Sequence, residues 1–245
     1  MRPSGQIVDT PTATEFMDQI LERVSLSELS TVADDLPRKS AAMRELVGDR
    51  PEAMDEATLH RLLRWSFGSR RRTKDILATV APTALAGAIA DLLNGDDDQL
   101  PARFAQFDEV MAGHVEPGFD LPGELLHFLA PDRYWLWTRW MWDPRTETGA
   151  LRLVTMDEVE LTGPTRGDTY LAVGRAVAFV EETGKAAGFT TMGDGLFGTD
   201  VFLAAVYGVY MYTVLQMRMT QEFNKVVPPL GDLTRRLLGV YHMEG

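Results

Sequence analysis

The stretch from Val201 to Met217 carries no charged residue, and this feature constrains the fold of the 245-residue chain more than any other. It is shorter than the roughly 20 apolar residues that a transmembrane helix needs, and it contains the polar residue Gln216. A helix that is apolar on all sides is typical of the centre of a soluble helical bundle. The sequence therefore predicts a long central helix, from Asp200 to about Asn224, and no membrane span.

Amphipathic helical patterns fill most of the remaining sequence. Apolar residues recur at spacings of three and four between capping residues, glycines and prolines. Thr12 and Glu15 have the spacing of a capping box, and Pro37 and Pro131 are expected to end helices. The predicted helices cover residues 12–24, 26–36, 40–47, 55–67, 82–93, 104–111, 121–129, 170–186 and 230–238.

One segment departs from this helical pattern. Residues 134–142 read YWLWTRWMW, which is rich in aromatic residues that favour strands. Turn signals follow at 143–144 and 148–149, and apolar residues then alternate from Leu151 to Thr155. The sequence predicts a β-hairpin with its loop at 144–149. A helix in place of the first strand is the alternative.

These patterns together predict a mainly α protein. We expect a single-domain helical bundle around the central apolar helix, with the β-hairpin as an insertion. Residues 1–13 are rich in Pro, Ser, Thr and Gly, so they are expected to form a flexible N-terminus ahead of one domain over 14–245. The acidic run at 96–98 marks a soft boundary inside that domain.

The aromatic segment contains four of the five tryptophans, which makes it the first candidate site. On a strand, Trp135 and Trp137 would share one face with Arg139, and Trp140 and Trp142 would lie on the other. One set of rings would pack inward, and the other would face a ligand or a partner protein. Burial of both faces in the core is the alternative.

The second candidate is a run of cations, which we call the basic segment (Arg61–Lys74). It contains no acidic residue in a chain whose net charge is −12. Its cations are Arg61, Arg64, Arg70, Arg71, Arg72 and Lys74. The run predicts a site for a phosphate, a nucleic-acid backbone or an acidic partner. A solvated face paired with the protein's own carboxylates is the alternative.

Several kinds of chemistry find no support in the sequence. The chain has no cysteine, which excludes a disulfide scaffold, thiol catalysis and the usual structural zinc sites, and fits a cytoplasmic location. Glu124 and His127 have the Glu-x-x-His spacing of di-metal bundles, but no second such pair exists, so His127 is expected to be buried and hydrogen-bonded. The sequence therefore predicts no metal and no cofactor, and it favours binding over catalysis.

A short region is similar to a known family. Residues 125–136, LLHFLAPDRYWL, with Leu121-Pro122-Gly123 upstream, resemble a segment of bacterial helical modules related to helix-hairpin-helix DNA glycosylases. The resemblance implies a helical, nucleic-acid-associated module. It does not extend to glycosylase chemistry, because the expected acid falls near Trp137 or Thr138.

Three functions follow as predictions. The first is a non-catalytic accessory protein of a bacterial type, which binds a partner protein or a second copy of itself through the tryptophan-rich surface. The second is a nucleic-acid-associated module that uses the basic segment, although the acidic net charge disfavours it. The third is a small-molecule binding protein or enzyme with an aromatic pocket formed by residues 135–142 and the tyrosines at 207, 210 and 212.

Overall fold

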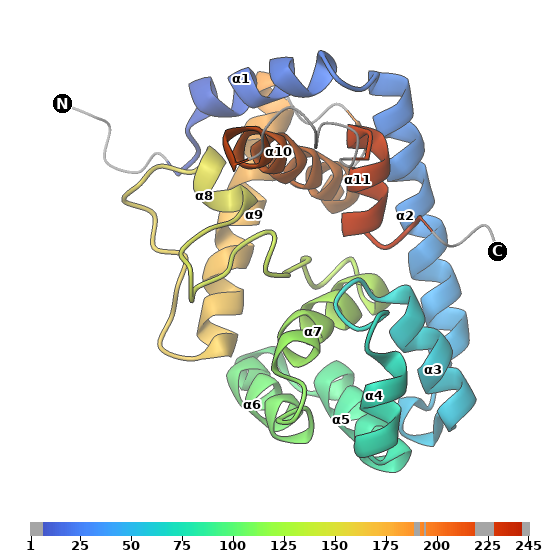
Figure 1. Ribbon diagram of the computed structural model, residues 1–245. Coiled ribbons are helices and arrows are strands. Elements are labelled where there is room, and N and C mark those ends of the chain that lie inside the picture. Colours follow the sequence, from blue (N-terminus) through green and yellow to red (C-terminus); the bar gives the residue numbers. More distant parts are fainter. Residues whose placement is uncertain (1–6, 189–191, 194, 219–227, 242–245) are drawn as a thin grey trace. The chain divides into compact units, whose positions relative to one another are not determined.

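The computed structural model describes residues 7–188, 192–193, 195–218 and 228–241, and within these residues it is mainly helical (Figure 1). The prediction of a mainly α protein is therefore confirmed. The α-helices are α1 (Thr10–Leu21), α2 (Leu26–Val47), α3 (Glu56–Trp65), α4 (Thr73–Thr79), α5 (Pro82–Asn94), α6 (Leu100–Val110), α7 (Val115–Leu129), α8 (Ala150–Val154), α9 (Arg166–Ala187), α10 (Gly195–Arg218) and α11 (Leu230–Leu237). Two short 3-10 helices are η1 (Pro51–Ala53) and η2 (Asp97–Gln99).

The chain divides into two compact units. The first takes its residues from Met1–Pro37, Trp140–Val159 and Arg175–Tyr241, and the second from Arg38–Arg139 and Glu160–Gly174. The division falls inside α2 and α9, whereas the acidic run at 96–98 lies within the second unit. The expectation that the chain folds as a single domain over 14–245 stays a prediction.

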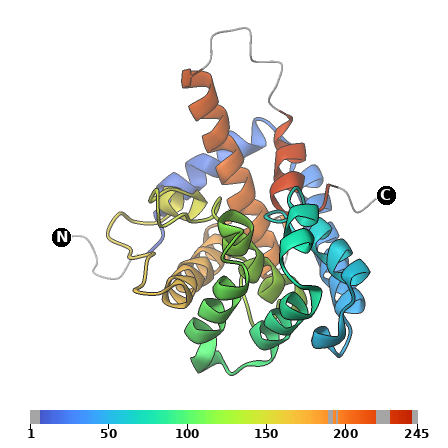
Figure 2. The same cartoon turned by 60° about the horizontal axis from the view of Figure 1, so that its bottom comes forward.

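The first unit is built around the apolar helix α10. This helix packs against α1, α8 and α11, and Figure 2 shows α10 and α11 side by side. The approach of α11 is close, because a Cβ added at Gly208 would lie 2.4 Å from a methyl carbon of Leu230. An ion pair between Asp35 and Arg235 adds a link from α2 to α11. Residues Gly195–Val214 are long and apolar enough to cross a membrane, but most of them are buried inside the protein.

The second unit is an assembly of short helices, α3 to α7, in which α5 packs against α3, α6, α7 and η1. A buried arginine closes the end of α5: the Arg103 guanidinium donates hydrogen bonds to the carbonyl oxygens of Leu92, Gly95 and Asp96. The Leu92 carbonyl belongs to the last turn of α5, where carbonyls have no helical donor, so Arg103 satisfies a buried acceptor there.

The predicted hairpin is wrong. No strand occurs within the described residues, and residues 134–142 form an irregular segment with a turn at its end. The chain does turn back at 143–148, where Asp143 and Thr148 form an isolated antiparallel bridge. A short helix, α8, then replaces the second strand. The first N–H groups of α8, from Ala150 and Leu151, donate to the carbonyls of Trp140 and Met141, which occupies the hydrogen bonds that a strand ladder would have used.

Two prolines lie inside helices, and one of them, Pro37, was expected to end its helix. Helix α2 runs through Pro37, and α7 runs through Pro122. The Leu121-Pro122-Gly123 step is therefore part of a continuous helix, not half of a hairpin. An internal proline costs about 3 kcal/mol, and burial of neighbouring side chains such as Leu36 and Leu121 offsets this cost.

The N-terminal region is ordered earlier than expected. Of the predicted flexible stretch 1–13, residues 1–6 lie outside the described residues, but α1 already begins at Thr10. Its N-cap is Asp9, whose carboxylate accepts a hydrogen bond from the Thr12 N–H, so Thr12 is not the capping residue. Val8 is buried and forms an isolated bridge with Thr155.

Candidate functional site

The tryptophan-rich segment is largely buried. The exposed fractions of Trp137, Trp140 and Trp142 are 0%, 3% and 2%, so these three rings are not available to a ligand or partner. The expectation that one face of this segment lies open is therefore not met, and the alternative of burial on both sides describes these three residues. Of the four tryptophans in this segment, Trp135 alone has a partly exposed side chain.

Trp135 is held by contacts within the second unit. Its ring stacks on Tyr170 with 4.9 Å between ring centroids. Its indole N–H donates to the Tyr170 carbonyl at 2.9 Å, and the Tyr170 hydroxyl donates back to the Trp135 carbonyl at 2.9 Å. The indole also lies directly over Gly174, where an added Cβ would be 1.8 Å from the ring. This ring is a packing element of the unit.

In the first unit, Trp140 and Trp142 contact neighbouring side chains. Trp140 lies beside Tyr207 of α10, with 6.3 Å between ring centroids. The Arg152 guanidinium lies 5.2 Å from the centroid of Trp142, which is a cation–π distance. Trp142 therefore joins the irregular segment to α8, and Trp140 joins it to α10.

Arg139, the cation predicted to accompany these rings, is fully engaged with carboxylates. Its guanidinium donates to Asp120 at 2.7 Å and pairs with Glu116 at 3.3 Å. Asp120 also accepts a hydrogen bond from the Arg139 backbone N–H at 2.8 Å. Arg139 thus anchors the irregular segment to α7 and has no free edge for a ligand.

A second arginine, which the sequence analysis did not single out, lies against several aromatic rings. The Arg166 guanidinium is 4.7 Å from the centroid of Phe119, 5.4 Å from Phe104 and 5.9 Å from Trp137, and it pairs with Asp108. Burial raises the pKa of Asp108 and lowers the pKa of Arg166, while their mutual attraction acts against both shifts. The protein's own guanidinium therefore fills this aromatic cage.

The basic segment, in contrast, is mostly exposed. It comprises the exposed end of α3, a turn over residues 66–72, and the start of α4 (Figure 1). The exposed cations are Arg61, Arg64, Arg71, Arg72 and Lys74. Arg70 is half-buried, with its guanidinium 5.1 Å from the centroid of Phe67.

Few carboxylates of the protein reach these cations. Arg72 pairs with Asp75 at 3.4 Å, and both side chains remain well exposed. Arg61 helps to lower the pKa of Asp55, although hydrogen bonds from Thr58 are the larger cause. Within the described part of the chain, Arg71 and Lys74 form no ion pair. Pairing with the protein's own acids, the alternative for this segment, therefore does not account for the charges of Arg71 and Lys74.

Buried hydroxyl groups shape the turn of the basic segment. Ser69 donates to the Leu63 carbonyl at 2.7 Å, and Ser66 donates to the Leu62 carbonyl at 3.2 Å. Thr73 donates back to the Ser69 carbonyl at 3.2 Å. Ser66 and Ser69 thus satisfy carbonyls in the last turn of α3, and Thr73 satisfies one in the turn itself, while Arg71 and Arg72 are exposed.

A buried carboxylate on α7 holds the same turn. Glu124 accepts hydrogen bonds from the N–H groups of Phe67, at 2.8 Å, and Gly68, at 3.1 Å. Burial raises the pKa of Glu124, whereas the nearby Lys39 ammonium and the two N–H groups act in the opposite direction. The sequence presents Glu124 only as half of a possible metal pair with His127. Its role in the turn has no signature in the sequence.

His127, the other member of that pair, has a structural place. It is fully buried, and its Nδ1 lies 2.9 Å from the Tyr134 carbonyl oxygen, as the prediction of a buried, hydrogen-bonded histidine requires. Among the residues that the structure describes, no group of three or more His, Asp and Glu side chains has a geometry that would hold a metal ion.

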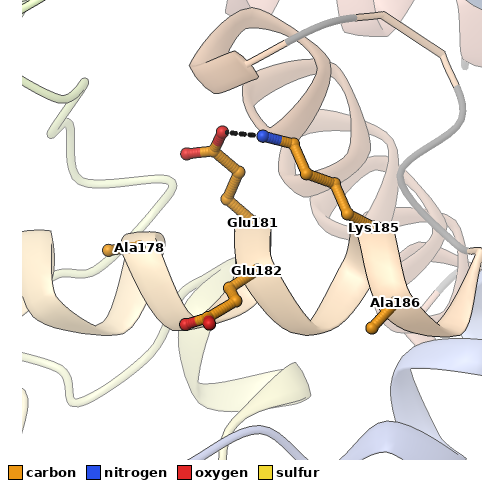
Figure 3. Close-up of a pocket in the computed structure, with 5 residues that line it drawn as sticks. All are labelled: Ala178, Glu181, Glu182, Lys185 and Ala186. Atoms are coloured by element: carbon orange, nitrogen blue, oxygen red, sulfur yellow. Dashed lines mark hydrogen bonds and ion pairs between the residues drawn. The ribbon is translucent and has the colours of Figure 1, made fainter.

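The structure also has a surface depression along α9, far in sequence from the predicted site residues (Figure 3). Its lining residues are Ala178, Glu181, Glu182, Lys185 and Ala186. Glu181 and Lys185 form an ion pair at 2.6 Å, drawn as the dashed line in the figure. This is a common pairing along one helix face, and the depression has no aromatic lining.

Comparisons of the chain with known protein families, with curated proteins and with solved structures find no match. The function must therefore be argued from the residues themselves.

Proposed function

We propose that this protein is an accessory binding protein that holds the phosphate backbone of a nucleic acid through its basic segment. The observation that carries the proposal is the exposure of most cations of Arg61–Lys74, together with the absence of any acidic residue between them. A cluster of exposed like charges is unfavourable unless a counter-charge is supplied, and a polyanion supplies it.

The residue types favour phosphate as the counter-charge. All but one of the cations are arginines, whose planar guanidinium offers five N–H donors that match the oxygens of a phosphate in a bidentate arrangement. Contacts to the backbone position a protein on nucleic acid but do not read sequence. The expected activity is therefore binding with little sequence preference.

The net charge of −12 limits this binding without abolishing it. Charges on the protein surface are screened beyond about 8 Å at physiological ionic strength. A segment free of carboxylates along its whole length therefore presents a locally positive surface even on an acidic protein. The affinity is expected to be moderate, since distant acidic residues still contribute some repulsion at low salt.

The other two predicted functions have less support. Protein binding through the tryptophan-rich surface loses its basis because Trp137, Trp140 and Trp142 are buried. An aromatic small-molecule pocket has no counterpart in the depression on α9. Association with a partner protein through another surface stays a prediction, as do the cytoplasmic location and the absence of a membrane span.

The proposal is tested with fluorescently labelled duplex DNA and single-stranded RNA, measured by anisotropy against labelled poly-glutamate as an acidic peptide. The variant is the triple alanine substitution of Arg71, Arg72 and Lys74, all of which are exposed. Its matched control is the triple alanine substitution of Arg23, Arg50 and Arg175, which are exposed elsewhere and change the net charge equally. We expect the first variant to lose about tenfold or more in nucleic-acid affinity, and the control to lose little.

Two outcomes would overturn the proposal. Equal losses in the variant and its control would show that only bulk charge matters. Binding of poly-glutamate in preference to both nucleic acids would assign the basic segment to an acidic protein partner instead.

A further inference from the structure

We infer that Glu124 is a positioning residue that fixes the turn of the basic segment in the conformation that binds the polyanion. This inference rests on the proposed function, since it concerns the same segment. The carboxylate lies on α7, on the inner side of the turn, and it is buried, so it cannot itself touch the ligand. Its effect on binding would pass entirely through the backbone at Phe67 and Gly68.

The hydrogen-bond geometry suits an ionised carboxylate. Each oxygen of Glu124 accepts from a different N–H group: Oε1 from Phe67 at 2.8 Å and Oε2 from Gly68 at 3.1 Å. Two acceptors on one rigid group fix both the position and the orientation of two consecutive peptide units. A glutamine side chain has the same shape but only one acceptor, so it would meet one of these N–H groups with an NH2 group.

The turn also has no room to shift toward α7. A Cβ added at Gly68 would lie 2.5 Å from the Cβ of Asp120, which is too close for two carbon atoms. Asp120 cannot move away freely, because the Arg139 backbone N–H and guanidinium hold both of its oxygens. Glycine at position 68 and glutamate at position 124 thus act together to hold the turn against the helix.

Two charged groups face Glu124 within the second unit. Lys39 of α2 is fully buried and favours the ionised carboxylate, whereas Asp120 on the same helix as Glu124 disfavours it. The charge of Asp120 is largely balanced by Arg139, which pairs with it at 2.7 Å. The surroundings therefore supply the positive charge and the N–H donors that an ionised Glu124 needs at this buried position.

The deciding variant is Glu124→Gln, with Glu116→Gln as its matched control. Both remove one negative charge from α7, but Glu116 is exposed and does not contact the basic segment. On charge alone, either change would strengthen binding to labelled duplex DNA. We expect Glu124→Gln instead to weaken it roughly tenfold, which corresponds to one lost charge-assisted hydrogen bond, and Glu116→Gln to leave it equal or slightly stronger.

A second measurement does not depend on any ligand. Hydrogen exchange at the Phe67 and Gly68 amides should be faster in Glu124→Gln than in the wild type, and unchanged in Glu116→Gln. Gly68→Ala, which displaces the turn without changing any charge, should weaken DNA binding as well and provides the test if Glu124→Gln does not fold.

The outcomes separate the two proposals. If the wild type fails to bind either nucleic acid, the proposed function is wrong, and the role of Glu124 in binding fails with it. If the wild type binds but Glu124→Gln binds as tightly as Glu116→Gln, the basic segment retains its function and only the positioning role of Glu124 is wrong.

Discussion

At Gly174 the Trp135 indole lies directly against the backbone of α9. An alanine Cβ at this position would lie 1.8 Å from the Trp135 indole, so the ring would have to leave its place on Tyr170. We expect Gly174→Ala to lower the free energy of unfolding by about 1–3 kcal/mol, as overpacking of a well-filled site does. Denaturant unfolding monitored by circular dichroism measures this change.

The matched control is Gly87→Ala in α5, where nothing lies within 4 Å of an added Cβ. Alanine is favoured over glycine inside a helix by up to about 1 kcal/mol, so this variant should be neutral or more stable. A Gly174→Ala protein as stable as Gly87→Ala would show that Trp135 does not occupy the place described here.

The tryptophans of this protein differ in their exposure to solvent. Trp137, Trp140 and Trp142 are buried, whereas Trp65 and Trp135 are partly exposed. Acrylamide should therefore quench only a minor part of the fluorescence, and replacing both Trp65 and Trp135 with Phe should remove most of the quenchable part. Substantial quenching that persists in the double variant would restore the tryptophan-rich segment as an open surface.

The burial of these rings could not be predicted from the sequence. Aromatic residues occupy both alternating faces of residues 134–142, so a period of two gives no inner and outer side. Strand propensity reports how well a side chain fits a half-buried surface, and here each ring found a separate partner on a helix. By contrast, the N-cap at Asp55 and the helix end before Gly48, with its φ of 64°, agree with the predicted helix bounds at 55 and 47, because they depend on local geometry alone.

Among the secondary-structure elements, α7 shows how an internal proline is tolerated. Pro122 has no N–H, so the Gly118 carbonyl one turn earlier loses its helical donor. The Arg166 guanidinium supplies the missing donor at 3.3 Å and also donates to the Phe119 carbonyl at 2.8 Å. A distant residue therefore completes the helix, which is why the helix predicted over 121–129 begins later than α7 does.

Replacement of Arg166 tests whether its guanidinium stabilises α7. Arg166→Met keeps an unbranched apolar side chain but leaves the Gly118 carbonyl and the Asp108 carboxylate without their donor, so we expect a loss of roughly 2–3 kcal/mol in the free energy of unfolding. Arg175→Met, an exposed position on the same helix, should cost less than about 0.5 kcal/mol. Similar unfolding midpoints for the two variants would contradict a structural role for Arg166.

For the whole molecule, the fold class could be predicted from the sequence, but the contacts between distant segments could not. The apolar stretch predicted a long buried helix, and α10 is that helix, with Val201 to Val206 buried; the predicted end near Asn224 lies outside the described residues. The basic segment was recognised from charge alone, because exposure of cations needs no long-range information. What the sequence lacked was pairing between distant segments: Glu124 with the turn at 67–68, and Arg166 with α7.

The opposite signs of the whole charge and the local charge predict an unusual dependence of binding on salt. The Debye length is about 30 Å at 0.01 M salt and about 10 Å at 0.1 M. At the lower concentration a nucleic acid experiences the full charge of −12 and is repelled, whereas near 0.1 M it experiences mainly the basic segment.

Affinity for duplex DNA should therefore rise from 0.01 M to about 0.1 M NaCl and then fall, because counterions compete for the phosphates at higher salt. Anisotropy titrations across this range, repeated with the triple alanine variant of Arg71, Arg72 and Lys74, measure both arms. The falling arm should become shallower in the variant, since fewer phosphates are neutralised, while the rising arm should persist. A steady decrease from the lowest salt would mean that the carboxylates elsewhere on the protein do not influence the encounter.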